Sequence, residues 1–219
     1  MRKEQGVKGL TIYLIRHGES EHNVDYTIME HIHDSEHNLT ELGQKQAKAT
    51  ADFLKNVVSE KTILYSSPYA RTMQTAKAIH AELPGEVPFL QNPLIREWEL
   101  GNLLNINNRT PQLKKEFKAS GSFFYRYPNG ESMADVYLRA TMFYNTFLQR
   151  VKQQNRYEDV IMVSHSAFMH AFLTFMMQWP IDNKAKPKPF DNACVIAIDE
   201  VDGDYQYKQI FAPKISVTN

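Results

Sequence analysis

The sequence is poor in cysteine and has no long hydrophobic run. Its 219 residues include a single cysteine, Cys194, so no disulfide bond can form within the chain, as is typical of proteins from a reducing compartment. No uninterrupted apolar run approaches the ~20 residues of a membrane-spanning helix. The first residues, MRKEQGVKG, contain no apolar segment of the secretory type. We therefore expect a cytoplasmic protein with no membrane partner.

The chain also lacks an excess of either charge. Its 25 Lys and Arg residues balance its 25 Asp and Glu residues, so no overall field would attract nucleic acid. Any anion must therefore be bound by a local cluster, and the expected partner is a small molecule. No repeat, low-complexity tract or linker divides the sequence, which predicts a single domain over residues 1–219. Nothing in the sequence indicates the oligomeric state.

Short apolar runs alternate with segments of helical pattern along the chain. Strands are predicted around Ile12–Ile15, at residues 61–65 and 159–163, near Phe89, and at 192–198 and 205–211. Helices are predicted at about 40–58, 69–82, 133–153 and 166–179, with a weaker one at 111–118. Residues 24–39 are polar and read as irregular. This alternation predicts a three-layer α/β/α sandwich with a largely parallel central sheet.

Three of the predicted strands end in polar triplets. These are Arg16-His17-Gly18, Ser66-Ser67-Pro68 and Ser164-His165-Ser166. Parallel strands place such residues on one edge of the sheet, where ligands bind. Arg71 follows in the first turn of the next helix, a position that favours anions. The residue types suit a phosphoryl group, because arginine matches phosphate oxygens and a histidine nitrogen can attack phosphorus.

The longer motifs around these residues resemble those of the histidine phosphatase (phosphoglycerate-mutase-like) superfamily. The similar segments are TIYLIRHGESEHN, NLTELGQKQA, SSPYARTMQTA, LIREWELGNL and VSHS. The resemblance implies three catalytic residues, which are His17, Glu97 and His165. It implies substrate binding by Arg16, Asn23, Arg71 and Ser166, although Ser166 stands where the family usually has glycine. The segment FFYRYPNGESMADVYLR is similar to a branch in which many members lack a settled substrate.

The implied chemistry is phosphoryl transfer through a phosphohistidine. His17 attacks phosphorus, and Glu97 protonates the leaving group and then activates water. Glu99 and Glu131 compete with Glu97 for this role. Burial or the bound phosphate would raise the pKa of Glu97, whereas neighbouring Arg96 would lower it, and the sequence leaves the balance open. The arginines supply the positive charge, so no metal or other cofactor is expected.

Four histidines in or near the irregular segment offer a metal-binding alternative. His22, His31, His33 and His37 are interleaved with acidic side chains, namely Glu30, Asp34 and Glu36. No regular element is predicted there to fix a ligand geometry. A solvated, partly acidic loop beside the pocket is therefore the favoured interpretation.

Several functions remain open. The favoured one is a phosphatase acting on a small phosphorylated metabolite. A phosphoglycerate-type mutase is less favoured, because residues 102–129 are compact where those enzymes carry a longer basic insert. An anion-binding module without catalysis is the third possibility, and the intact set of Arg16, His17, Arg71 and His165 argues against it.

Overall fold

A six-stranded sheet forms the centre of the protein. The structure, a computed structural model, describes residues 9–181 and 189–215. The strands are β1 (Thr11–Arg16), β2 (Thr62–Ser66), β3 (Phe89–Gln91), β4 (Asp159–Ser164), β5 (Val195–Val201) and β6 (Asp204–Phe211). Their order across the sheet is β3-β2-β4-β1-β5-β6. Strands β3, β2, β4 and β1 run parallel, β5 is antiparallel to β1, and β6 is antiparallel to β5.

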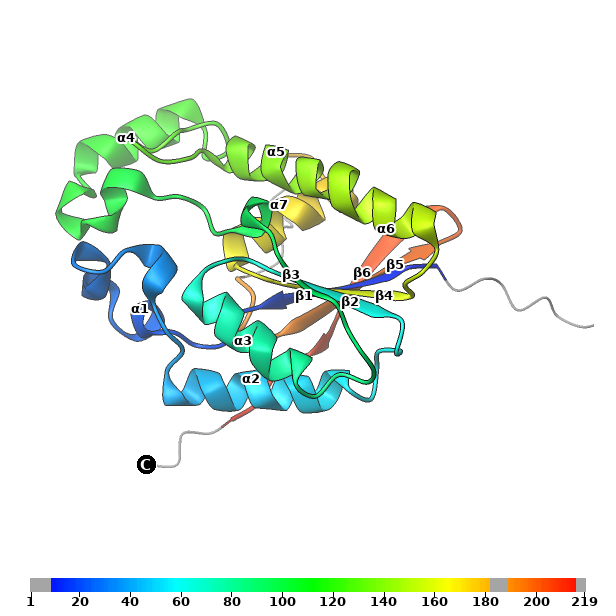
Figure 1. The fold of residues 1–219 in the computed structure, drawn as a ribbon. Helices are drawn as coiled ribbons and strands as arrows, with labels where there is room; N and C mark the ends of the chain where they lie inside the picture. The colour runs from blue at the N-terminus through cyan, green and yellow to red at the C-terminus, as the bar shows by residue number, and fades with distance from the viewer. Residues whose placement is uncertain (1–8, 182–188, 216–219) are drawn as a thin grey trace, which may run out of the picture.

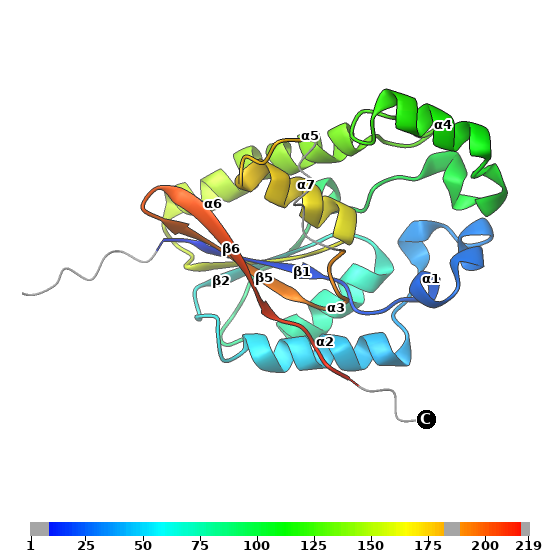
Figure 2. The same ribbon diagram turned by 180° about the vertical axis from the view of Figure 1, so that it is seen from behind.

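Helices cover both faces of this sheet (Figures 1 and 2). The longer helices are α2 (Glu41–Leu54), α3 (Ala70–His80), α4 (Pro111–Ser120), α5 (Met133–Phe143), α6 (Gln149–Gln154) and α7 (Ser166–Met176). Helices α2 and α3 lie on one face, and α5, α6 and α7 lie on the other. The short helix α1 (Glu21–Val24) and α4 lie at the end of the molecule toward which β1 runs. The predicted three-layer α/β/α architecture with a largely parallel sheet is confirmed.

The alternating side chains of β1 supply two separate cores. Ile12 and Leu14 belong to a cluster with the apolar residues of α5 and α7. Tyr13 and Ile15 belong to a second cluster with those of α2 and α3. Because successive side chains of a strand point to opposite faces, one apolar run anchors both helical layers.

Two glycines bring α2 against the loop that follows β1. A Cβ on Gly18 would lie 2.5 Å from the carbonyl oxygen of Gly43, and one on Gly43 would lie 1.9 Å from that of Glu19. Neither position can hold a larger residue without backbone movement. Thr40 begins the helix, and its hydroxyl accepts a hydrogen bond from the Gly43 N–H at 3.0 Å. The threonine and glycine of NLTELG thus fix α2 beside the RHG loop.

The segment at residues 24–39 differs from its predicted irregular form. It contains two 3-10 helices, η1 (Tyr26–Glu30) and η2 (Asp34–Glu36). Their starts are marked by local hydrogen bonds rather than by periodicity, since the Asp25 carboxylate accepts from the Thr27 N–H at 2.9 Å. The remaining short 3-10 helices are η3 (Pro93–Ile95), η4 (Gly101–Leu104) and η5 (Ile106–Asn108).

The long helix predicted at 133–153 is present, with a local irregularity. Ser132 and Asp135 form the expected capping box at its start. A π-helical turn, η6 (Tyr144–Leu148), joins α5 to α6. None of the helices formed by residues 9–181 and 189–215 is long and apolar enough to cross a membrane. The sequence start considered above, residues 1–8, lies outside the described residues.

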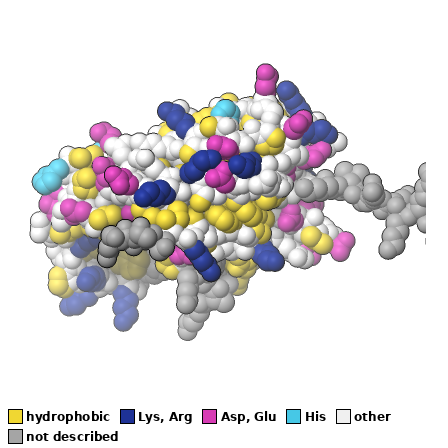
Figure 3. All heavy atoms as spheres, turned by 90° about the horizontal axis from the view of Figure 1, so that it is seen from below, with side chains coloured by type: hydrophobic (Ala, Val, Ile, Leu, Met, Phe, Trp, Pro, Cys, Tyr) yellow, Lys and Arg dark blue, Asp and Glu magenta, His cyan; other side chains and the backbone are white. Residues whose placement is uncertain are grey.

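The surface on the side of α2 carries charges of both signs. In Figure 3 acidic and basic side chains lie interspersed beside a band of hydrophobic ones. Ion pairs account for part of this mixture, since Lys48 contacts Asp52 at 2.9 Å and Glu82 at 2.8 Å. This agrees with the balanced composition of the chain.

Candidate active site

The ends of β1, β2 and β4 bring the three polar triplets together. In the parallel register Arg16 is level with Ser164, and Ser66 with Val163. The pairing continues one residue further, because the His17 N–H donates to the Ser164 carbonyl at 3.0 Å and the Ser67 N–H to the Val163 carbonyl at 3.0 Å. The predicted convergence of the triplets on one sheet edge is what the structure shows.

His17 is held in one tautomer by its neighbour. Its ring is 1% exposed, and Nδ1 lies 2.7 Å from the Gly18 carbonyl oxygen. Because a carbonyl can only accept, Nδ1 carries the hydrogen and Nε2 carries the lone pair of the neutral ring. Burial lowers the pKa of His17 well below its usual value, and the charges of Arg71 and Arg16 lower it further. The unliganded protein therefore presents a neutral imidazole.

His165 lies next to His17, with ring centroids 5.2 Å apart. Its Nε2 forms a 2.8 Å hydrogen bond with the Ser67 hydroxyl. Its Nδ1 is buried and has no hydrogen-bond partner among the residues that the structure describes. Burial, followed by the charge of Arg71, lowers the pKa of His165 as well.

Both predicted phosphate-binding arginines reach this region. Arg16 donates from Nη1 to the Phe190 carbonyl at 2.5 Å. Arg71 is 1% exposed and bonds to Asp34, donating from Nη1 to its carbonyl and from Nη2 to its carboxylate Oδ2, the latter at 3.1 Å. The Nε atoms of both arginines are buried and unpartnered within the described part of the chain. Two guanidinium donors and His165 Nδ1 thus lack a protein partner within the described residues.

Glu97 is positioned by two backbone amides. Its Oε1 accepts from the Trp98 N–H at 2.9 Å and from the Ala167 N–H, in the first turn of α7, at 3.2 Å. Burial raises the pKa of Glu97, although the Trp98 hydrogen bond and the charges of Arg71 and Arg16 oppose the rise. The sequence left open whether burial raises the pKa of Glu97 or Arg96 lowers it, and in the structure the effect of burial is the larger one.

The two competing glutamates lie in different surroundings. Glu131 Oε1 accepts from Arg139 Nε at 2.8 Å and from Arg96 Nη2 at 2.6 Å, and Oε2 accepts from Arg139 Nη2 at 2.9 Å. Oε2 also accepts from the Glu99 N–H at 3.1 Å. Arg96 therefore pairs with Glu131, and Glu97 alone of the three glutamates lines the cavity described next.

A cavity of about 570 Å³ opens beside these groups. Arg71 and Glu97 line it, as does Ser166. Its apolar lining comes from helices and loops and includes Tyr26, Met29, Trp98, Leu100, Phe123 and Met133. The volume is much larger than a phosphate group requires.

Asn23 contacts its neighbours in the chain and Asn192. Its Oδ1 accepts from the Ser20 N–H at 3.1 Å and from Asn192 Nδ2 at 3.2 Å, and its Nδ2 lies 3.1 Å from His22 Nε2. Asn192 also donates to the His17 carbonyl at 3.1 Å, so it connects Asn23 to the histidine loop. Substrate binding by Asn23 and Ser166 stays a prediction.

Sequence reasoning missed three contributors to this site. Asp34 bonds Arg71, Ser67 bonds His165, and Asn192 supports His17. Ser67 was recognisable as part of a strand-end triplet. Asp34 and Asn192 lie in irregular segments, and no local pattern signals contacts across 37 and 175 residues.

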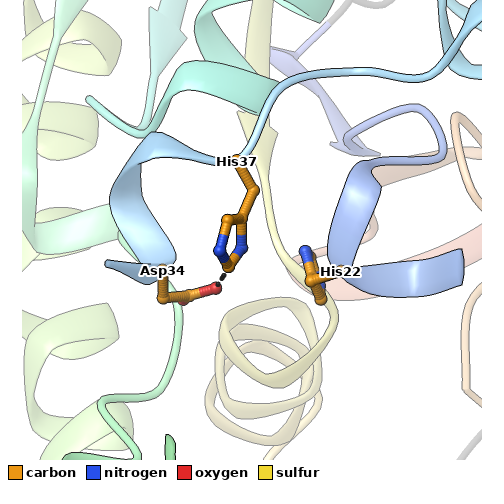
Figure 4. Close-up of side chains that lie close together, drawn as sticks. All are labelled: His22, Asp34 and His37. Atoms are coloured by element: carbon orange, nitrogen blue, oxygen red, sulfur yellow. Dashed lines mark ion pairs between the residues drawn. The ribbon is translucent and has the colours of Figure 1, made fainter. Parts of the chain in front are cut away.

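The histidine-rich segment is less solvated than predicted. His31 and His33 are exposed, but His22, Asp34 and His37 are 7%, 7% and 0% exposed. Figure 4 shows the three side chains close together, from α1, from η2 and from the residue after η2. Their ligand atoms lie within 4.8 Å of one another. The expectation of a solvated loop is wrong for these three residues, because the short helices fold them inward.

Comparison with known proteins identifies the superfamily to which the chain belongs. Residues 12–212 match the sequence profile of the histidine phosphatase superfamily, branch 1. The phosphoglycerate mutase-like protein AT74H of Arabidopsis thaliana is 28% identical over 215 residues, covering 90% of this chain and 75% of that protein. An acid phosphatase of Mycobacterium tuberculosis is 30% identical over 176 residues, covering 80% of each chain.

Solved structures show the same architecture. YhfR of Bacillus stearothermophilus superposes with a TM-score of 0.75 at 22% identity, covering 94% of this chain and 98% of that one. A mycobacterial glucosyl-3-phosphoglycerate phosphatase in complex with VO3 gives a TM-score of 0.72 at 19% identity, covering 93% and 98%. At these identities the superpositions establish the shared fold.

Proposed function

Because the chain belongs to the histidine phosphatase superfamily and is a phosphatase of that type, we propose that it hydrolyses the monoester of a small phosphorylated metabolite through a phosphohistidine on His17. The acid phosphatase among its relatives supports hydrolysis over transfer to a second substrate. The compact segment at 102–129 supports it as well, since a mutase must shield its phosphoenzyme from water.

The observation that carries the proposal is the set of buried donors without acceptors. Arg16 Nε, Arg71 Nε and His165 Nδ1 have no partner among the described residues. A buried donor left unpaired is costly, so such groups are normally satisfied by a ligand or water. The oxygens of a phosphoryl group beside His17 would accept from both arginine nitrogens, and from His165 Nδ1 when the Ser67 hydroxyl donates to Nε2. The same donors would stabilise the charge that the equatorial oxygens carry in the transition state.

In the first step, the lone pair on His17 Nε2 forms a bond to phosphorus while the bond to the ester oxygen breaks. Glu97 donates its proton to that oxygen, so the product leaves as an alcohol. The raised pKa of Glu97 keeps the acid form available for this step. The Nδ1 hydrogen bond to Gly18 stabilises the positive charge that develops on the ring.

In the second step, water replaces the histidine on phosphorus. Glu97, now a carboxylate, takes a proton from the attacking water, and the P–N bond breaks as the new P–O bond forms. Inorganic phosphate and neutral His17 are the products of the step. Arg16 and Arg71 supply the positive charge throughout, so the reaction is proposed to need no metal ion.

The cavity narrows the class of substrate. Its size and its aromatic and aliphatic lining favour a metabolite in which the phosphate is attached to an apolar or aromatic body. Tyr26 and Trp98 both line the cavity and can contact such a body.

The proposal is tested by trapping the intermediate. A panel of alkyl and aryl phosphates with released phosphate as readout identifies a substrate, which is then used in 32P-labelled form. Acid-labile, base-stable label is expected on the wild-type protein and none on His17→Ala, with turnover reduced on the order of 10⁴-fold or more. Label retained by His17→Ala would remove this residue from the mechanism. Transfer of phosphate between two monophosphoglycerates without release would replace hydrolysis by mutase activity.

A further inference from the structure

His22, Asp34 and His37 form a compact group that the hydrolysis above does not use. Two imidazoles and one carboxylate are the donor set that suits Zn²⁺ and its neighbours among the transition metals. All three residues are buried, and their ligand atoms lie within 4.8 Å of one another (Figure 4). His22 and Asp34 also line the cavity, so one side of the group is open to it.

The contacts of His37 leave a lone pair aimed at Asp34. Its Nε2 lies 3.2 Å from the Ile32 carbonyl, which can only accept, so Nε2 carries a hydrogen. Nδ1 lies 3.5 Å from Asp34 Oδ1. Neither atom has a hydrogen-bond partner among the described residues, and both are buried. A backbone carbonyl on the far nitrogen is the usual support of a metal-bound histidine.

The two oxygens of the Asp34 carboxylate also differ in their partners. Oδ2 accepts from Arg71 Nη2 at 3.1 Å, which holds the group in place and leaves Oδ1 for another partner. Two ligands of a tetrahedral ion, each at about 2.1 Å, stand about 3.4 Å apart. The 3.5 Å between Asp34 Oδ1 and His37 Nδ1 therefore already suits one shared ion.

His22 can supply the third ligand if the cation replaces one hydrogen bond. The Asn23 amide nitrogen donates to its Nε2 at 3.1 Å, so Nε2 carries the lone pair and Nδ1–H donates to the Ser20 hydroxyl at 3.0 Å. A cation would take the place of the Asn23 hydrogen bond, while the Ser20 contact keeps the ring in orientation.

From these contacts we propose that His22, Asp34 and His37 bind a divalent transition-metal ion of the Zn²⁺ class. The three side chains supply protein ligands, and the fourth position faces the cavity. The ion would link α1 to η2, and Asp34 would connect it to Arg71. This ion takes no part in the hydrolysis by His17. Failure of the metal-site proposal would therefore leave the phosphatase mechanism intact, and the reverse also holds.

The test uses the tag-free, full-length protein after stripping with a chelator. Co²⁺ is added as the probe, because a four-coordinate site gives intense visible absorption bands that hexaaqua Co²⁺ lacks. One Co²⁺ per chain is expected, displaced by Zn²⁺. His22→Gln and His37→Gln should weaken binding by about 100-fold or more, as loss of a direct ligand requires. The exposed His31→Gln is the matched control and should bind like wild type.

Two further arms keep the result decisive. Circular dichroism reports whether each variant is folded, and phosphatase activity does so for the variants that keep His17. X-ray absorption on the wild-type Co²⁺ protein counts imidazole ligands without any substitution. His17→Ala should bind Co²⁺ normally, which separates this site from the catalytic histidines. Absence of the absorption bands, binding unchanged in folded His37→Gln, or binding lost in His31→Gln or His17→Ala would overturn the proposal.

Discussion

The floor and the wall of the cavity are built by different means. The floor is the polar group beside the cavity, and it consists of Arg16, His17, Ser67, Arg71 and His165. Of these Arg71 also lines the cavity, and His17, Arg71 and His165 are 0–1% exposed. The wall consists of the apolar lining residues Tyr26, Met29, Trp98, Leu100, Phe123 and Met133. These come from η1, from the start of α5 and from loops, and Tyr26 is 50% exposed. The floor thus has rigid support and charge, whereas the wall has shape and apolar area, so we assign chemistry to the first and selectivity to the second.

The largest effect should come from the floor. Arg71→Ala removes a charged phosphate contact and should lower kcat/KM by on the order of a hundredfold or more for every substrate tested. Steady-state kinetics on one alkyl and one aryl phosphate measure it. Arg126→Ala is the control, because that side chain is 61% exposed and pairs with Asp135. A small loss confined to one substrate would show that Arg71 contacts the body of that substrate rather than the phosphoryl group.

Glu97 lies between the two regions, and its effect should depend on the leaving group. Glu97→Gln keeps the shape and removes the proton, so it should strongly slow phosphorylation by an alkyl phosphate. An aryl phosphate leaves as a stable phenolate and should depend on the donor far less. Burst kinetics isolate the phosphorylation step. If Glu131→Gln or Glu99→Gln shows this pattern instead, the proton donor is misassigned.

The pH dependence follows from the same two groups. The depressed pKa of His17 keeps this side chain neutral in mildly acidic solution. The acid limb of the kcat/KM profile should therefore lie below pH 6.5, the ordinary pKa of histidine. The pKa of Glu97 is raised above its ordinary 4.5, and alkyl phosphate hydrolysis should fall as the pH rises through it. This basic limb should be absent in Glu97→Gln, and its persistence there would assign it to another group.

The smallest effect is expected from the wall. Leu100→Ala removes apolar contact area worth about 1–2 kcal/mol to a substrate that covers it. It should lower kcat/KM about tenfold for a bulky aryl phosphate and leave a small alkyl phosphate unchanged. Losses of equal size on both substrates would show that Leu100 supports the floor rather than the substrate body.

The sequence predicted the floor far better than the wall. Strand periodicity located the three triplets, and a parallel sheet forces their ends together, so Arg16, His17 and His165 could be placed without coordinates. Burial of Glu97 and its raised pKa could not, because its surroundings come from distant parts of the chain, such as Arg71 and Ala167, whose N–H donates to Glu97 from 70 residues away. The pairing of Asp34 with Arg71 was missed for the same reason. Short helices such as η1 and η2 carry no periodic signal at all.

The central position of β1 in the sheet makes the backbone of the floor open less often than the backbone of the wall. This strand pairs with β4 on one side and β5 on the other, so its amides belong to the most enclosed part of the sheet. Exchange of such amides with solvent deuterium requires opening that approaches global unfolding, whereas loops exchange through local openings of lower free energy. His17 therefore stays in register through fluctuations that repeatedly open and reclose the loops around the cavity.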